Sequence, residues 1–188
     1  MERGDDMEQN INAFIHHTIR RHEDRRLLAI DATCGNGHDT LLLAELYDQV
    51  IGFDIQPVAL DATAKRLRQA GYDNVKLVLD SHALMERHLG EDSIDLAVFN
   101  LGYLPHGDKT IITTPDATMA AVETILRHLA IRGLIAITVY TGHPGGQLEA
   151  DALTAMLKDL DKHDYTVIVH RYLNRRQAPF AILIERMQ

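Results

Sequence analysis

The strongest constraint on the fold is the order of apolar runs, because strand-like runs and helix-like stretches alternate almost to the end of the chain. The strand-like runs carry apolar side chains at consecutive positions, which is typical of strands buried on both faces of a parallel sheet. Five such runs span residues 27–33, 50–55, 75–79, 94–101 and 134–140. The pattern predicts an α/β fold with a mostly parallel sheet that helices cover on both faces.

Helices are expected between these strands and before the first one. Pro57 suits the first position of one helix and Gly71 suits its end. Thr113 or Thr114 is expected to cap the helix that begins at Pro115. The predicted helices span residues 8–21, 37–46, 57–70, 115–130 and 147–162.

The end of the chain departs from this alternation. Two strand-like runs, 165–172 and 180–185, are separated only by residues 173–179. This connection is too short for a parallel crossover, so the pair is predicted to be antiparallel. The whole chain, residues 1–188, is therefore expected to form one domain with a seven-stranded sheet, a C-terminal antiparallel hairpin and an N-terminal helix.

Composition narrows the function classes. Cys34 is the only cysteine, which excludes an internal disulfide and fits a reducing compartment. The N-terminal segment from Met1 to Asn10 is polar and acidic, without the apolar stretch of a secretory signal. No apolar run is close to the length of about 20 residues that spans a bilayer. We expect a cytoplasmic protein that uses neither a membrane nor a metal.

The formal net charge of −8 argues against a protein that coats nucleic acid by bulk charge. Two local basic patches could still bind RNA. The alternative is that their arginines lie on solvated faces and pair with nearby acids such as Glu23 and Asp24. The candidate patches comprise Arg20, Arg21, Arg25 and Arg26 in the first segment and Arg171, Arg175 and Arg176 in the second.

A glycine-containing turn and a following acid indicate a nucleoside site. Gly35 and Gly37 lie between the first strand and its helix, where they permit a tight turn and close approach to a ligand. Asp54 ends the second strand, where a carboxylate can accept hydrogen bonds from both ribose hydroxyls. A structural turn with a solvated aspartate is the alternative.

The charges around this turn favour S-adenosylmethionine over NAD as the cofactor. Asp39 lies in the first helical turn, where a pyrophosphate would bind in a dinucleotide site, and Thr40 replaces the third glycine of that motif. S-adenosylmethionine has no phosphate and carries a sulfonium cation, so Asp31 and Asp39 are compatible with it. Asp39 could also act only on the helix dipole.

Polar residues after the third strand are candidates for the adenine side of the site. Asp80, Ser81 and His82 follow that strand, and a carboxylate or hydroxyl there can bond the exocyclic amine. An ordinary helix N-cap by Asp80 or Ser81 is compatible with this role.

The end of the fourth strand carries the candidate reaction site. Asn100 to Tyr103 partly resemble the Asn-Pro-Pro-Tyr motif of methyltransferases that modify planar amines, with Leu-Gly in place of Pro-Pro. In that motif the Asn oxygen and a backbone carbonyl orient the amine, while the aromatic ring stacks on the base. A turn with Tyr103 as packing is the alternative.

Methyl transfer to an aliphatic amine first requires loss of a proton, because such an amine has a pKa of about 10. The candidate proton acceptors are Asp108, His106 and His143, the last in the loop after the fifth strand. Cys34 is expected to be a small buried residue rather than a nucleophile.

Together, the segments DATCGNGHDT, GFDIQ, DSH, FNLGYLPHGDK and VYTGHPGG resemble a bacterial family labelled rRNA methylases, from about residue 10 to the C-terminus. Members act as tRNA 5-aminomethyl-2-thiouridine methyltransferases at the wobble position. The resemblance implies a class I methyltransferase fold, S-adenosylmethionine, a tRNA anticodon stem-loop substrate and a homodimer. It departs from the wider methyltransferase pattern at Thr33, where a glycine is common.

The resemblance also implies residue roles. It places cofactor contacts on Asn36, His38, Asp54, Gln56, Ser81 and His82, and the substrate side on Asn100, Gly102, Tyr103 and residues 142–146. We predict that Asn100 and Gly102 face the cofactor as well. Methylation of rRNA or of a small-molecule amine, an NAD-dependent oxidoreductase and a non-catalytic binding module remain alternatives.

Overall fold

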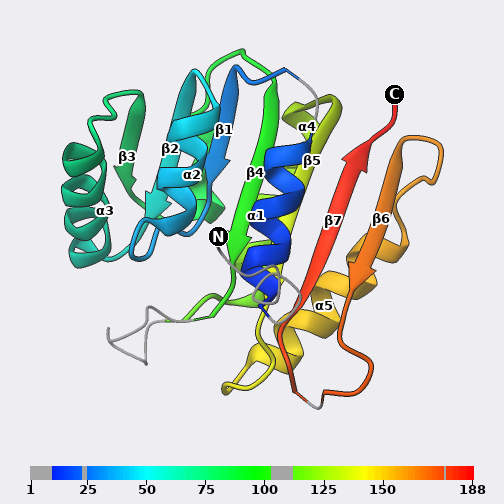
Figure 1. The fold of residues 1–188 in the computed structure, drawn as a ribbon. Coiled ribbons are helices and arrows are strands. Elements are labelled where there is room, and N and C mark those ends of the chain that lie inside the picture. Colours follow the sequence, from blue (N-terminus) through cyan, green and yellow to red (C-terminus); the bar gives the residue numbers. More distant parts are fainter. Residues whose placement is uncertain (1–9, 23–24, 103–111, 176) are drawn as a thin grey trace, which may run out of the picture.

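The described part of the chain, residues 10–22, 25–102, 112–175 and 177–188 of the computed structural model, contains one sheet of seven strands in the order β3-β2-β1-β4-β5-β7-β6 (Figure 1). All neighbouring strands are parallel except the β5–β7 and β6–β7 pairs, which are antiparallel. The strands are β1 (Leu28–Asp31), β2 (Gln49–Asp54), β3 (Val75–Leu79), β4 (Ile94–Asn100), β5 (Leu129–Val139), β6 (Tyr165–His170) and β7 (Phe180–Arg186). The predicted sheet and its antiparallel C-terminal hairpin are confirmed.

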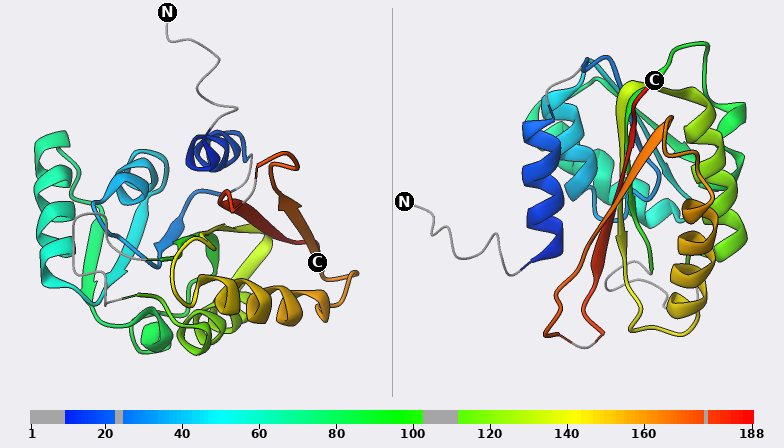
Figure 2. Two further views of the ribbon diagram at one scale, coloured as in Figure 1. Left: turned by 90° about the horizontal axis from the view of Figure 1, so that it is seen from below. Right: turned by 90° about the vertical axis from the view of Figure 1, so that its right-hand side faces the viewer.

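Helices cover both faces of the sheet, as Figure 2 shows. The helices α1, α2 and α3 lie on one face, and η1, α4 and α5 lie on the other. Their bounds are α1 (Ile11–Arg21), α2 (His38–Leu46), α3 (Pro57–Ala70), the 3-10 helix η1 (His82–Arg87), α4 (Pro115–His128) and α5 (Gly146–Lys158).

The central strand β4 shows why the strands are apolar at consecutive positions. Ala97 and Phe99 belong to the hydrophobic cluster that includes α4 and α5. Leu96 and Val98 belong to the cluster on the other face, which includes α1 and α2. Because both faces are covered, apolar side chains are favoured on both faces of the strand.

Local signals explain the ends of two helices. Asn10 caps α1 by accepting a hydrogen bond from the Asn12 backbone at 3.0 Å. Pro57 begins α3, and Gly71 ends it in the left-handed conformation, with φ of 81°. Proline at the first position and glycine at the end are the residues that these two places favour. Both bounds predicted for α3 are confirmed.

The N-cap position predicted for α4 is confirmed at Thr114, but the expected side-chain hydrogen bond is absent. The Thr113 hydroxyl donates instead to the Glu149 carboxylate, at 2.8 Å. This long-range partner keeps Thr113 from the helix end.

Many boundaries differ from the sequence-based ones, mostly by one or two residues, and the ends of α4 and α5 and the start of β5 are among them. The helices α4 and α5 end earlier, at His128 and Lys158, and β5 begins earlier, at Leu129. Leu129 pairs with Ile94, and the register then shifts before Leu134. Arg132, with φ of 64°, lies within this shift. Such a bulge interrupts the regular pairing, so the run near residue 134 revealed only the second half of the strand.

The sheet brings the carboxyl ends of β1 to β5 to one edge. The loop between β6 and β7 lies at the same edge, because Phe180 at the start of β7 pairs with Val139 at the end of β5. In the part of the chain that the structure describes, no helix has both the length and the apolar character needed to cross a bilayer.

Candidate active site

A crevice of about 1060 Å³ lies at this carboxyl edge. Its walls are the loop after β1, the ends of β2 to β5, and the first turns of α1. Open α/β sheets bind ligands in this position, and the volume suits a nucleoside cofactor together with part of an acceptor.

The turn after β1 has a backbone conformation that lets a ligand approach it closely. Gly35 has φ of 54° and Gly37 has φ of 76°. This left-handed region of backbone conformation favours glycine. A Cβ atom on Gly37 would lie 2.8 Å from the Thr63 hydroxyl oxygen, so a larger residue would also push α3 away. The turn therefore leaves its backbone exposed to the crevice.

Asp54 links this turn to the end of β2. Its two carboxylate oxygens accept one backbone hydrogen bond each, from Gly35 and from Gln56, both at 2.9 Å. A carboxylate oxygen can accept more than one hydrogen bond, so both oxygens can still accept a ligand hydroxyl. Gln56 and Asp54 both line the crevice.

Asp31 lies beneath the crevice rather than on its wall. Its fully buried carboxylate accepts hydrogen bonds from the Thr33 backbone at 3.1 Å and the Thr40 hydroxyl at 2.6 Å. Burial and the negative charge of Asp39 raise the pKa of Asp31 to about 7. The structure thus gives Asp31 a role in shaping the turn, and a direct cofactor contact stays a prediction.

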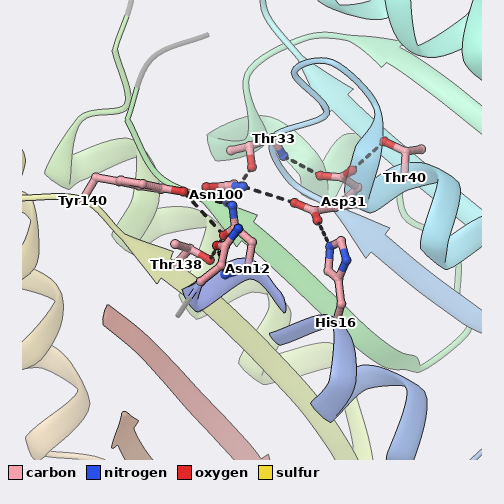
Figure 3. Close-up of polar contacts among 10 residues, drawn as sticks. Asn12, His16, Asp31, Thr33, Thr40, Asn100, Thr138 and Tyr140 are labelled. Carbon is pink, nitrogen blue, oxygen red and sulfur yellow. Dashed lines mark hydrogen bonds and ion pairs between the residues drawn. The ribbon is translucent and has the colours of Figure 1, made fainter. Parts of the chain in front are cut away.

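A polar network joins Asp39 to α1 and to the end of β4, and its members His16, Thr33 and Asn100 are labelled in Figure 3. One Asp39 carboxylate oxygen contacts His16 Nε2 at 2.5 Å, and the other accepts a hydrogen bond from Asn100 Nδ2 at 3.3 Å. The Asn100 backbone N–H donates to the Thr33 hydroxyl at 2.7 Å. The Asn100 residue is therefore held from two sides.

The end of β3 supplies three of the predicted residues. Ser81 accepts a hydrogen bond from the Ala83 backbone and caps η1, as the alternative structural role predicted. Asp80 contacts His88 Nε2 at 2.8 Å, and this contact lowers the pKa of Asp80. All three, including His82, line the crevice.

One ring nitrogen of His82 has no hydrogen-bond partner among the described residues. Its Nδ1 lies 3.1 Å from the Ala32 carbonyl oxygen, so Nδ1 must carry the proton and donate. Burial lowers the pKa of His82, which keeps the ring neutral. Its buried Nε2 has no partner among the described residues, so it presents an acceptor that fits an N–H or O–H of a ligand.

Asn36 and His38 also line the crevice, and both contact Arg66 of α3. Arg66 donates to the Asn36 carbonyl at 2.9 Å and lies 3.3 Å from His38 Nε2. Burial, followed by the Arg66 charge, lowers the pKa of His38. Arg66 was not identified from the sequence, because its position in α3 carries no motif.

The acceptor side begins at Gly102, just after β4. The Gly102 N–H donates to the Thr113 hydroxyl at 3.0 Å, and the Gly102 carbonyl accepts from the Thr113 N–H at 3.0 Å. The buried Glu149 carboxylate accepts the Thr113 hydroxyl at 2.8 Å and the Thr118 hydroxyl at 2.6 Å. This buried acid in α5, which sequence analysis did not single out, thereby fixes the position of Gly102.

His143 also lines the crevice, from the loop after β5. Its ring lies against Gly102 and Gly146, since a Cβ atom on either glycine would lie 3.6 Å or 2.8 Å from His143 Nε2. The ring Nδ1 lies 3.0 Å from the Pro144 carbonyl oxygen. The predicted loop thus reaches the end of β4.

The α1 helix contributes residues that sequence analysis missed. Asn12 Nδ2 donates to the Tyr140 hydroxyl at 3.1 Å, and Asn12 Oδ1 accepts from the Thr138 hydroxyl at 3.2 Å. Asn12 and His16 stand at positions i and i+4, so they share one side of the helix. That spacing was the available signal, but it did not show that this side faces the crevice.

Some predictions are not tested by the described coordinates. Tyr103, His106, Asp108 and Arg176 lie outside the described residues.

Cys34 is buried, and burial raises the pKa of its thiol well above the usual value, which opposes a role as nucleophile. Among the described residues no group of three or more potential metal ligands comes together.

The sheet order with its antiparallel β7, the glycine turn after β1 and the acid ending β2 define a class I S-adenosylmethionine-dependent methyltransferase. A family model described as "Putative rRNA methylase" matches residues 50–185. The chain belongs to this rRNA methylase family, as its motifs predicted.

Solved structures agree in sequence and in fold. A methyltransferase from Streptococcus mutans, solved in complex with S-adenosylhomocysteine (SAH), is 38% identical with a TM-score of 0.87, and the match covers 95% of this chain and 98% of that one. An rRNA methylase from Clostridium thermocellum is 33% identical with a TM-score of 0.90, with the same coverage. S-adenosylmethionine rather than NAD is thereby confirmed as the cofactor.

A curated relative points to a substrate class. The chloroplastic tRNA (mnm(5)s(2)U34)-methyltransferase of Arabidopsis thaliana is 38% identical in an alignment of 168 positions that covers 82% of this chain. The match covers 61% of the plant protein, so the chain spans about three fifths of that relative's length.

The described residues fit the cofactor. Asp54 offers carboxylate oxygens to ribose hydroxyls, and His82 Nε2 offers a buried acceptor to an adenosyl N–H or O–H. Asp39 places a carboxylate on the crevice wall beside the turn, which favours a sulfonium cation.

Proposed function

We propose that the chain methylates the aminomethyl nitrogen of 5-aminomethyl-(2-thio)uridine at the wobble position of tRNA. The observation that carries the proposal is the orientation of Asn100. A carboxylate only accepts hydrogen bonds, so the Asn100 group that contacts Asp39 must be its NH₂. The remaining amide oxygen, Oδ1, is then the acceptor that the end of β4 offers to an amine N–H.

This arrangement suits direct displacement. When bound, S-adenosylmethionine supplies an electrophilic methyl group on sulfur. Asn100 Oδ1 would hold one amine hydrogen and so direct the nitrogen lone pair toward that methyl group. Because Asn100 is fixed by Asp39 and Thr33, its orientation costs no rearrangement when the acceptor binds.

A surface beside the crevice suits RNA. We call residues 171–175, in the loop between β6 and β7, the hairpin-loop surface. Arg171 lies over the Phe180 ring at 5.0 Å, and Arg175 lies over the Tyr172 ring at 4.3 Å. Arginine next to aromatic rings is a common way to bind phosphates and unpaired bases. Gln177, from the same loop, lines the crevice.

The first predicted patch is less suited to RNA. Arg20 makes a two-point contact with Glu45, at 3.0 and 2.8 Å. Arg25 contacts the buried Asp95 and Ser93. Arg20 and Arg25 are thus engaged by acids within the chain, whereas Glu23 and Asp24 lie outside the described residues. We therefore assign RNA binding to the hairpin-loop surface alone.

The plant relative supports the wobble nucleoside as acceptor, and the family name keeps rRNA as a competing one. Purified protein should be incubated with labelled S-adenosylmethionine and one of three acceptors. These are an anticodon stem-loop carrying 5-aminomethyl-2-thiouridine, the same RNA with unmodified uridine, and unmodified rRNA. Labelling of the aminomethyl RNA alone would support the proposal, and labelling of rRNA alone would refute it.

The Asn100→Ala variant tests the residue that carries the argument. We expect its methyl transfer to fall by about 100-fold or more, since orientation of the acceptor is lost. Gln147→Ala removes an exposed amide near the same edge and should leave the rate unchanged. An Asn100→Ala enzyme with the wild-type rate would contradict the assigned role. The predicted homodimer and cytoplasmic location stay predictions, the first of which sedimentation would test.

A further inference from the structure

The His16–Asp39 pair is not explained by cofactor binding or by the Asn100 contact alone. His16 comes from α1 and Asp39 from the first turn of α2, and their side chains meet at 2.5 Å in the crevice wall. The side chains are 33% and 17% exposed. The pair is therefore sheltered but still reached by solvent.

We propose that His16 is the group that removes the proton from the acceptor amine. The inference rests on the proposed function, because an aliphatic ammonium must lose a proton before its nitrogen can attack. The contact with Asp39 occupies His16 Nε2, so Nε2–H is the donor and Nδ1 keeps the lone pair. No other hydrogen bond within the described residues involves the His16 ring.

The same carboxylate joins this base to the acceptor site. Asp39 contacts His16 with one oxygen and accepts from Asn100 Nδ2 with the other. One side chain thus fixes both the residue that orients the amine and the residue that receives its proton. A carboxylate that holds a histidine in one tautomer and stabilises its imidazolium is an established arrangement in enzymes.

The step balances. The ammonium passes a proton to His16 Nδ1 and becomes a neutral amine. The nitrogen lone pair then forms the N–CH₃ bond, while the electron pair of the S–CH₃ bond remains on sulfur and leaves SAH. His16 then returns its proton to water, which its exposure permits.

The charged groups around His16 come from several elements. Asp39 and His38 face it from α2, and the buried Asp31 lies below Asp39. The charge of Arg66 in α3 contributes to the lowered pKa of His38, and the charge of Asp39 contributes to the raised pKa of Tyr140 after β5. Among these groups, Asp39 is the carboxylate in direct contact with His16.

The test is the pH profile of single-turnover methyl transfer to the anticodon stem-loop carrying 5-aminomethyl-2-thiouridine, with saturating S-adenosylmethionine. We expect His16→Gln to lower the rate about 100-fold or more near pH 7.5. Its deficit should shrink as pH rises, because the amine ionises unaided toward its pKa of about 10. His17→Gln changes the exposed neighbour on the same helix and should match the wild type throughout.

Different results would refute the proton-transfer role of His16 and the proposed function. A His16→Gln rate that lies below the wild type by a constant factor at every pH, with weakened S-adenosylmethionine binding by calorimetry, would overturn the proton-transfer role. A wild-type rate in this variant would do the same. If the wild-type protein leaves the aminomethyl RNA unmethylated but methylates another acceptor, the proposed function fails instead. Thermal unfolding of the variant checks that the fold is intact.

Discussion

The buried Asp31 predicts an unusual dependence of stability on pH. Burial and the Asp39 charge raise its pKa from 3.8 to about 7, so the folded protein holds this proton more tightly than the unfolded chain does. Stability from Asp31 is then complete below about pH 3.8 and is lost as pH rises toward 7. About three pKa units at about 1.36 kcal/mol each give a total loss of the order of 4 kcal/mol.

The Asp31→Asn variant isolates this effect. An asparagine can accept from the Thr33 N–H with its oxygen and donate to the Thr40 hydroxyl oxygen, so both contacts have a substitute. It stays neutral at every pH. We expect its free energy of unfolding, relative to wild type, to rise by about 2–3 kcal/mol between pH 5 and pH 7.5, most of it below pH 7.

Urea unfolding of both proteins at half-unit pH steps measures the difference directly. Asp48→Asn, at an exposed position, serves as the matched control and should show no such rise. A difference between Asp31→Asn and wild type that stays constant across this range would refute the reasoning, because Asp31 would then be ionised throughout.

Three other substitutions test other parts of the site. Asp54→Ala should weaken S-adenosylmethionine binding by about 1–3 kcal/mol by calorimetry, and a wild-type dissociation constant would exclude the ribose role. Replacing Arg171 and Arg175 together by alanine should weaken RNA binding and its salt dependence, whereas Arg127→Ala, near the far end of α4, should not; equal effects would contradict the hairpin-loop assignment. Glu149→Ala should lower the free energy of unfolding by about 2–4 kcal/mol in urea, since it strands two hydroxyls and leaves a cavity; an unchanged value would rule out this anchoring role.

The parts of the fold that sequence predicted are those set by local chemistry. Both ends of α3 were predictable because Pro57 and Gly71 act on the helix turn beside them. The start of β5 was not, because Leu129 belongs to the strand only through its pairing with Ile94. The hydrogen-bond partner of Thr113 was not predictable for the same reason, since Glu149 lies in a different helix far along the chain.

In the candidate site, the positions of the residues that follow strands were predictable from the sequence, whereas their contacts were not. Asp54, His82 and Asn100 follow three strands of one parallel sheet, so the fold class alone predicted that they would meet at its carboxyl edge. The roles within that set were harder to see. That Asn100 faces Asp39, and that Asp31 lies under the turn instead of on the wall, depends on side-chain packing across several elements.

The proposed proton transfer depends on the placement of α1. Ile11, Ile15 and Ile19 are buried, so they fix the side of α1 that meets the sheet. Asn12 and His16 each directly follow one of these isoleucines, so they lie at the margin of the buried side, where the carboxyl edge begins. In the proposed mechanism, a crevice without α1 would keep Asp54 and the Asn100 amide but would lose the base that Asp39 holds. The proposal therefore depends on the first helix, although its sequence carries no methyltransferase motif.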